Sequence, residues 1–286
     1  MNAPRIVGTI IVRGGLHVQS LGFKQYLPLG CPVESAKEFD RWGIDEIALI
    51  LLDKNFKLNL NTISEVSSAV SVPVAAVGGL RSIMDAKAYV SGGADKIGFN
   101  YSLFENPQMV HEATKIFGQQ CIIASIDIVH YKSKLQHWNY WENKCSQYNI
   151  TSLIDKIKQV NVGEILLNFP EKDGSGTGMD LVAIKKIVKI SQTPVIALGG
   201  VGSVKHIVNC FKSANPSAIG IGNRLSHFEH SVYLFKKGLK DIGAPVRTGV
   251  NPCYDDSMID HDGRPINKSE KELEELNFQR IEPQMP

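Results

Sequence analysis

The sequence of 286 residues lacks several features that mark particular classes of protein. No apolar run reaches the roughly 20 residues that a membrane-spanning helix needs, and the N-terminus lacks the apolar core of a signal peptide. The formal net charge is only +2, so no strong field attracts nucleic acid or an anionic membrane. These absences predict a cytoplasmic, enzyme-sized protein with neither nucleic acid nor membrane as a partner.

Cysteines are few and are not spaced as metal ligands. The chain has five of them, and an odd number scattered without pairs is typical of reduced thiols. The sequence therefore predicts no metal site, no cofactor and no disulfide framework. The five cysteines are Cys31, Cys121, Cys145, Cys210 and Cys253.

Two stretches of the chain are similar to each other and lie about 120 residues apart. One runs over Val72–Gly79 and closes on Gly93–Asn100, and the other runs over Thr193–Gly200 and closes on Pro216–Asn223. Each has an apolar run, a glycine pair, a helical stretch and a second apolar run. This pattern predicts strand, loop, helix and strand in each unit, and hence parallel strands joined by crossover helices.

The same spacing predicts eight strands along the chain. Eight strand and helix pairs fit a (β/α)8 TIM barrel over residues 1–245, and the two-fold repeat predicts two half-barrels. A doubly wound open sheet is the alternative. The strands are expected at Ile6–Val12, Ile47–Leu52, Val74–Val77, Lys96–Phe99, Ile122–Ile128, Glu164–Leu167, Val195–Leu198 and Ala218–Ile221, and helices among them at Pro32–Trp42, Ser82–Val90, Pro107–Phe117, Leu181–Ile190 and Ser203–Phe211.

Residues 246–286 differ in composition and are interpreted as a polar C-terminal extension. Ser269 and Glu272 have the spacing of a capping box and predict one short helix. An acidic cluster could hold a cation, although a solvated acidic turn is the favoured interpretation. Its members are Asp255, Asp256, Asp260, His261 and Asp262.

Glycine pairs and acids follow several of the predicted strands, at the end of the barrel where this fold places its chemistry. Gly78–Gly79 and Gly199–Gly200 precede helices, so their N–H groups could cradle two phosphates; glycines that only turn the chain are the alternative. Asp127 closes an apolar strand and points to an acid/base role, or else to a structural acid. Asp173, in a glycine-rich loop, is a second candidate.

Several of these segments together are similar to one known family. Gly163–Asn168, Asp173–Ser175, Gly93–Lys96 and Ser125–Asp127 resemble the cyclase subunit of imidazole glycerol phosphate synthase. The resemblance implies a barrel that receives ammonia from a separate glutaminase and passes it through its interior. The ammonia then reacts with a bis-phosphorylated ribonucleotide at the far end. The phosphate-binding residues expected here are Gly78, Gly79, Asn100, Gly174, Ser175, Gly199, Gly200, Gly222, Asn223 and Arg224.

The match with the family's catalytic residues is uneven. Asp127 corresponds to one of the two catalytic aspartates, but Ile11 stands where the resemblance implies the other, and isoleucine cannot transfer a proton. Gln19 replaces a lysine of the loop after the first strand. Arg224 follows Gly222 and Asn223 where small residues are usual, which puts the second phosphate site in doubt unless Arg224 contacts the anion.

At the opposite end of the barrel the resemblance is intact. Arg5, Glu46, Lys96 and Glu164 correspond to the ring of alternating charges at the family's ammonia entrance. A stabilising ion-pair network is the alternative for any one of them.

Three interpretations follow. The favoured one is an ammonia conduit, similar to the second-copy cyclase-like proteins of surface-polysaccharide pathways. It would take ammonia from a glutaminase docked on the N-terminal face and supply an ATP-dependent sugar amidotransferase that amidinates an N-acetyl sugar. The second is a histidine-pathway cyclase, and the third a non-catalytic scaffold. A glutaminase partner is needed in the first two, because the chain has no Gly-x-Cys-x-Gly motif.

Overall fold

The computed structural model describes residues 4–140, 142–227, 230–247, 266 and 269–275. It divides the chain into two compact units, Met1–Pro252 and Cys253–Pro286. In the described part of the chain, no helix combines the length and the apolar character that crossing a membrane requires.

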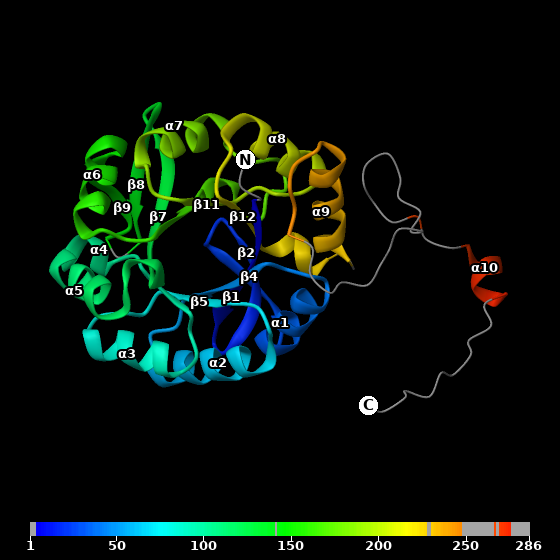
Figure 1. Ribbon diagram of the computed structural model, residues 1–286, viewed down its shortest axis with the longest axis horizontal. Helices are drawn as coiled ribbons and strands as arrows, with labels where there is room; N and C mark the ends of the chain where they lie inside the picture. Colours follow the sequence, from blue (N-terminus) through cyan, green and yellow to red (C-terminus); the bar gives the residue numbers. More distant parts are fainter. Residues whose placement is uncertain (1–3, 141, 228–229, 248–265, 267–268, 276–286) are drawn as a thin grey trace. The chain divides into compact units, whose positions relative to one another are not determined.

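Within the described residues of the first unit, eight parallel strands close into a barrel (Figure 1). Its last strand pairs with its first, since Ala218 lies beside Arg5, and β7 pairs with β10 to complete the ring. All eight predicted strands are confirmed, and the open-sheet alternative is wrong. The strands are β1 (Arg5–Arg13), β4 (Glu46–Leu51), β5 (Val74–Val77), β6 (Lys96–Phe99), β7 (Ile122–Tyr131), β10 (Glu164–Asn168), β11 (Val195–Leu198) and β12 (Ala218–Ile221).

Helices surround the barrel, as Figure 1 shows. Many begin at a side-chain cap: Asn55, Asn106 and Asp180 each accept the N–H of the residue three positions on, and such caps satisfy otherwise unpaired donors of a first turn. The helices are α1 (Pro32–Arg41), α2 (Phe56–Ala69), α3 (Ile83–Ser91), α4 (Ser102–Glu105), α5 (Pro107–Phe117), α6 (Ile150–Val160), α7 (Leu181–Ser191), α8 (Val204–Ala214) and α9 (Ser231–Asp241), with short 3₁₀ turns η1 (Gln119–Cys121), η2 (Pro170–Lys172) and η3 (Asn223–Ser226).

The barrel strands are apolar on both faces because each face is buried. Ile6, Ile10 and Val12 of β1 belong to the large core between barrel and helices, whereas Val7 lies in a smaller cluster inside the barrel. Such two-sided burial is typical of parallel sheets. The interior cluster consists of Val7, Ala48, Ala75, Val77, Ile123, Leu166, Ile196, Leu198 and Ala218.

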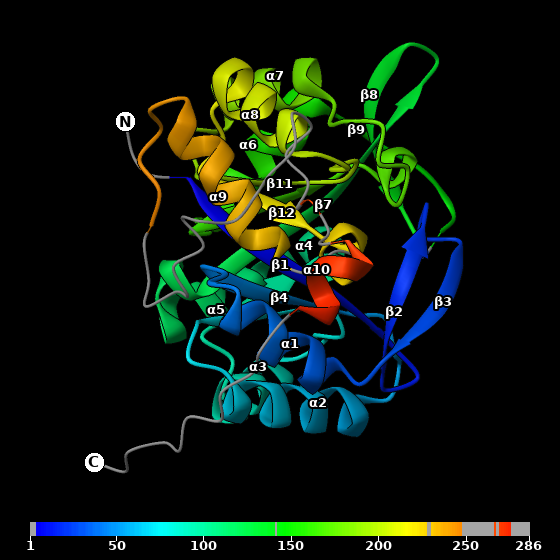
Figure 2. The same cartoon turned by 90° about the vertical axis from the view of Figure 1, so that its right-hand side faces the viewer.

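Two β-hairpins extend from the C-terminal ends of barrel strands. The first is formed by β2 (Leu16–Leu21) and β3 (Gln25–Gly30) after β1, and the second by β8 (Lys134–Asn139) and β9 (Lys144–Asn149) after β7. Figure 2 shows both on the same side of the barrel. They therefore flank the end at which this fold places its chemistry.

The described part of the second unit contains one short helix, α10 (Glu270–Glu274). Its predicted capping box is confirmed, because Ser269 N donates to Glu272 Oε2 at 2.8 Å and Glu272 N donates to Ser269 Oγ at 3.3 Å. The acidic cluster predicted at Asp255–Asp262 lies outside the described residues.

Candidate functional site

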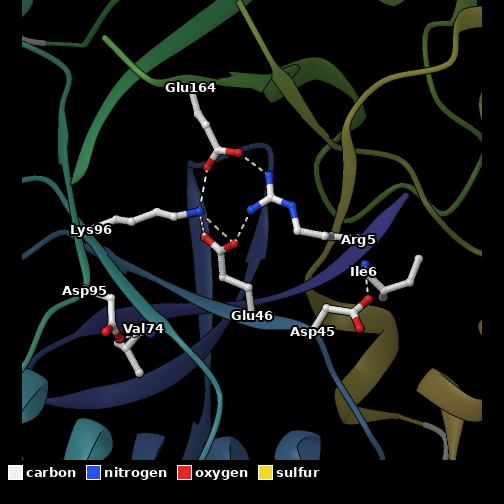
Figure 3. A network of polar contacts seen from close by, with 8 residues as sticks. All are labelled: Arg5, Ile6, Asp45, Glu46, Val74, Asp95, Lys96 and Glu164. Carbon is white, nitrogen blue, oxygen red and sulfur yellow. Dashed lines mark hydrogen bonds and ion pairs between the residues drawn. The ribbon is translucent and has the colours of Figure 1, made fainter. Parts of the chain in front are cut away.

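Four charged side chains form a closed ring at the end of the barrel where the strands begin (Figure 3). Arg5 donates to Glu46 at 2.5 Å and also to Glu164. Lys96 Nζ lies 2.9 Å from Glu46 Oε2 and 2.7 Å from Glu164 Oε2. Each cation contacts both acids, so the structure brings the four predicted residues together in alternating order.

A repeated local sequence positions two members of this ring. The pattern of glycine, apolar residue, aspartate and charged residue occurs at 43–46 and again at 93–96. Asp45 Oδ2 accepts the N–H of Ile6 at 2.7 Å, and Asp95 Oδ2 accepts that of Val74 at 2.8 Å (Figure 3). Each aspartate thus fixes the neighbouring strand. Because successive side chains of a strand alternate in direction, the following Glu46 or Lys96 points inward.

The ring is shielded and electrically balanced. Its side chains are between 3% and 17% exposed, with Glu46 the most buried, and two positive charges face two negative ones. A shielded ring of this kind opposes the passage of an ion, because the ion would lose its hydration on entering it. The same geometry is also that of a stabilising ion-pair network.

Asp127 lies at the opposite end of the barrel, held by two amides. Asn100 Nδ2 donates to Asp127 Oδ2 at 2.8 Å, and Asn168 Nδ2 donates to Asp127 Oδ1 at 2.7 Å. Burial raises the pKa of Asp127 to about 6, although both amide hydrogen bonds act to lower it and the Asp173 carboxylate adds to the rise. A carboxyl with a pKa close to neutrality is suited to accept and release protons.

Ile11 occupies the position in β1 that corresponds to Asp127 in β7. Val7 and Ile123 both belong to the interior cluster, and four residues further along each strand the alternation returns to the interior at Ile11 and Asp127. Ile11 is 3% exposed and lines a hollow at this end of the barrel. The side chain cannot exchange a proton, so Asp127 has no acidic partner from β1.

Two hollows at this end separate the predicted phosphate residues into two groups. The first has a volume of about 540 Å³ and is lined by Gly78, Gly79, Asn100 and Asp127. The second has a volume of about 240 Å³ and is lined by Ile11, Gln19 and six of the predicted phosphate residues. These six are Gly174, Gly199, Gly200, Gly222, Asn223 and Arg224. Ser175 lines neither of the two hollows. Leu198 lines both hollows. The arrangement has room for an anion at each side of the mouth.

Close backbone contacts explain two of the glycines without any ligand. Gly78 has φ +105°, and a Cβ there would lie 2.7 Å from the carbonyl oxygen of Leu51. Gly200 has φ +88°, and its Cβ would lie 2.3 Å from the carbonyl oxygen of Gly178. Neither position tolerates another residue. Phosphate binding by these loops therefore remains a prediction that rests on the hollows.

Asp173, the second predicted acid/base, holds the β2–β3 hairpin. Its Oδ2 accepts Ser20 Oγ–H at 2.6 Å and the N–H of Phe23 at 3.2 Å. Burial raises the pKa of Asp173, while the bonds from Ser20, Phe23 and Gly22 lower it. The carboxylate thus has a structural task whether or not it also moves protons.

Besides Asn100, two more of the predicted phosphate residues have partners within the protein. Asn223 Nδ2 donates to Ser20 O at 2.7 Å, and Asn223 Oδ1 accepts the Ser20 N–H at 3.2 Å, so this side chain fastens the hairpin as well. Ser175 Oγ donates to Lys172 O at 2.9 Å. One N–H of the Asn223 amide is thus already engaged, and a contact with an anion would use the second one or the backbone N–H.

The sequence analysis did not identify Asn168 or the basic residues at the mouth. Asn168 ends an apolar strand, and only the pairing of β10 with β7 brings it against Asp127. Arg13, Lys54 and Arg81 line the first hollow from three different segments. A single basic residue in a loop does not by itself indicate a binding site. These three residues come together only because the barrel closes.

The comparisons with known proteins agree with this architecture. A family model described as histidine biosynthesis protein matches residues 5–231. The chain belongs to this family. A Vibrio vulnificus (strain YJ016) protein provisionally named imidazole glycerol phosphate synthase subunit hisF2 is 30% identical over 264 residues, which cover 91% of this chain and 97% of the relative.

A second member of the family lies at a similar distance. Imidazole glycerol phosphate synthase subunit HisF of Thermococcus onnurineus (strain NA1) is 30% identical over 259 residues, which cover 86% of this chain and 99% of the relative. The family member described here is therefore a cyclase-subunit-like (β/α)8 barrel.

Proposed function

We propose that this barrel receives ammonia from a glutaminase docked on its N-terminal face and passes it to an acceptor at the C-terminal end. The acceptor chemistry is the amidination of an N-acetyl sugar in surface-polysaccharide biosynthesis, with an ATP-dependent sugar amidotransferase as the second partner. The observation that carries the proposal is the contrast between the two ends of the barrel. The charged ring at the entrance is complete, whereas the acid/base pair at the outlet has lost one member.

The entrance supports transfer because four residues from four strands must all be present to close the ring. Arg5 and Lys96 each reach both Glu46 and Glu164. Ammonia is neutral in the form that attacks an acceptor, so a balanced ring favours its entry over that of ammonium. Within the barrel, the cluster around Val7 and Ala48 offers apolar walls.

The outlet supports the loss of ring closure. That reaction, as the resemblance describes it, needs one group to give a proton while another takes one. Asp127 retains a suitable pKa of about 6, yet Ile11 supplies no second group. One remaining base is enough to accept the proton that ammonia releases when it adds to an electrophilic carbon.

A histidine-pathway cyclase is the second candidate, and Asp127 favours it. Its pKa near neutrality and the glycine loops on both sides of the mouth are what such an enzyme needs. In that case another group would replace the missing acid, and Asp173, which lines the second hollow, is the nearest in kind.

One assay separates the two candidates. We expect the purified protein, given the bis-phosphorylated ribonucleotide and ammonium, to close the imidazole ring at least about 10² times more slowly than a typical enzyme, because loss of one member of an acid/base pair removes about 10² to 10⁴ of rate. Ile11→Asp should recover part of that rate. Ile11→Asn should not, because asparagine has the size of aspartate but cannot transfer a proton. Wild-type turnover on the order of 10 per second would contradict the conduit and establish the cyclase.

A further inference from the structure

A third hollow lies beside the first, between the two hairpins. Its volume is about 540 Å³. It is lined by Lys24 from the β2–β3 turn, by Tyr131, Trp138, Tyr140 and Cys145 from the β7–β9 segment, and by Glu171 from the loop after β10. The roles proposed above, in ammonia entry and in proton transfer, do not account for the aromatic side chains that line this hollow.

The walls of this hollow are fixed by polar contacts. Glu171 Oε2 accepts the N–H of His130 at 3.2 Å, and His130 Nε2 lies 2.6 Å from Asp180 Oδ2. On the other side, Asp173 holds the hairpin through Ser20, as described above. The two hairpins and the loop between them are therefore tied to the barrel, and the hollow exists before any ligand binds.

Of the aromatic side chains that line this hollow, Tyr131 and Tyr140 are exposed and Trp138 is half-buried. Tyr131 is 47% exposed and Tyr140 40%. Tyr140 packs against Phe23 at 6.0 Å between ring centroids and against Trp138 at 6.5 Å. Aromatic surface left open to water in a preformed hollow is suited to a flat, partly apolar ring that stacks on it.

The charges around the hollow narrow the choice of ring. Glu171 and Asp173 line it with carboxylates, which only accept hydrogen bonds when ionised. A ring with several hydroxyl donors and an apolar face can donate hydrogen bonds to these carboxylates and stack on the aromatic side chains. Lys24 and Tyr140 line this hollow and also the first, where Arg13 offers positive charge.

We propose that this hollow binds the pyranose ring of a phosphorylated sugar, with the ring stacked on the face of Trp138 and its edge against Tyr140, whose ring is turned 80° from that of Trp138. The sugar hydroxyls donate to Glu171 and Asp173, and the phosphate lies toward Lys24 and the basic first hollow. This deepens the proposed function and rests on it for the identity of the acceptor, because the acceptor sugar would then be bound by the barrel itself. Binding is measured without any partner, so a failure here is separate from a failure of ammonia transfer.

The experiment measures binding and location together. Isothermal titration of the full chain with N-acetylglucosamine 1-phosphate gives the Kd, and thiol labelling of the peptide that carries Cys145, followed by mass spectrometry, reports occupancy of the hollow. We expect saturable binding and at least threefold slower labelling of Cys145 at saturation. Labelling of the exposed Cys31 serves as the internal control and should not change.

Three variants test the stacking. Trp138→Leu should raise the Kd about tenfold, because it removes an aromatic contact, whereas Trp138→Phe should keep most of the affinity. Leu27→Ala removes an exposed apolar side chain from β3 that does not line the hollow and should leave the Kd unchanged. Circular dichroism of each variant confirms that the fold is retained.

Other results would overturn the proposal. Equal protection of Cys145 by inorganic phosphate would show that only the anion is recognised. Tighter binding of adenosine 5′-monophosphate, with the same dependence on Trp138, would show that the hollow takes a nucleobase. An unchanged Kd in Trp138→Leu, or no binding of the sugar phosphate at millimolar concentration, would show that no sugar ring lies on these aromatics.

Discussion

At the scale of single residues, the chemistry at the C-terminal end of the barrel depends on how Asp127 is held. Its carboxylate is 5% exposed and receives one hydrogen bond from Asn100 and one from Asn168. Without those donors, burial would favour the protonated acid more strongly, because desolvation acts against charge. The amides therefore keep Asp127 usable as a base near neutral pH.

The raised pKa of Asp127 predicts a pH-dependent difference in stability. Because the pKa of Asp127 rises from 3.8 to about 6 on folding, its carboxyl binds more protons in the folded state between these values, and its contribution to wild-type stability falls as pH rises through them. Asp127→Asn removes this titration. The free energy of unfolding of the variant relative to wild type should increase between pH 4 and pH 6, by up to about 3 kcal/mol, and stay level above. Urea unfolding at several pH values measures it.

A difference between the two proteins that does not change with pH would contradict the assignment. It would mean that Asp127 has the same pKa in the folded and unfolded states, and the argument for its role as a proton carrier would fail with it.

The sequence identified Asp127 and Ile11, but it did not identify Asn168. An acid that ends an apolar strand stands out, and so does an isoleucine where the family resemblance implies an acid. An asparagine at the end of a strand is an ordinary boundary residue. Its role follows from a contact across 41 positions, which depends on which strands become neighbours.

At the scale of elements, the β2–β3 hairpin depends on the loop after β10. The carboxylate of Asp173 binds Ser20 and Phe23, and its backbone carbonyl accepts the Gly22 N–H at 3.2 Å. Phe23 has φ +52°, a left-handed conformation that a bulky residue adopts at some cost. One loop thus fixes the turn that covers both the Asp127 pocket and the aromatic hollow.

Loss of this carboxylate should loosen the hairpin without unfolding the barrel. In Asp173→Ala, we expect faster amide hydrogen exchange over residues 20–24, because the Phe23 N–H and the Ser20 side chain lose their acceptor. Exchange in β4 and β5 should not change. The matched control is Glu171→Ala. This change removes an acid from the same loop, but that acid binds the N–H of His130 and not the hairpin.

Unchanged exchange in Asp173→Ala would show that the hairpin is held by its own pairing. Equal loosening in Glu171→Ala would show that the loop, and not the Asp173 carboxylate, supports it.

The barrel strands were predictable and the hairpins were not, for a physical reason. A strand such as Val195–Leu198 is buried on both faces and appears as a continuous apolar run. In β3 the segment Gln25–Gly30 is largely exposed and contains Pro28, so it carries neither a long apolar run nor a regular alternation. Its pairing with β2 is set by the turn and by Asp173, which lies about 150 residues away in sequence.

At the scale of the whole molecule, a single barrel has two ends with different chemistry. The charged ring lies at one end and Asp127 at the other, and the apolar interior cluster around Val7 and Leu166 lies between them. Parallel strands make this possible, because all of them begin at one face and end at the opposite one. The eight strands of the barrel follow from the sequence, and the roles assigned to residues at its two ends stay predictions, whereas the sequence gives no sign of the aromatic hollow.

A second buried ion pair gives the whole-molecule test its control. Lys236 Nζ lies 2.7 Å from Asp45 Oδ1, with the lysine side chain 9% exposed. Asp45 precedes Glu46 in sequence and lies close to the ring, as Figure 3 shows, but Lys236 is not part of the ring. Replacing Lys96 leaves Glu46 and Glu164 each short of one partner, and replacing Lys236 leaves Asp45 short of one, so both changes should lower stability.

The most direct test of the conduit is nitrogen transfer in a system reconstituted from this protein, a glutaminase and a sugar amidotransferase. In Lys96→Met, glutamine-dependent amidination should fall at least tenfold, while external ammonium at high concentration should support the wild-type rate. In Lys236→Met, both nitrogen sources should work as in wild type. Equal loss with glutamine and with ammonium in Lys96→Met, or no loss with either, would contradict the account and leave the four charges as a stabilising network.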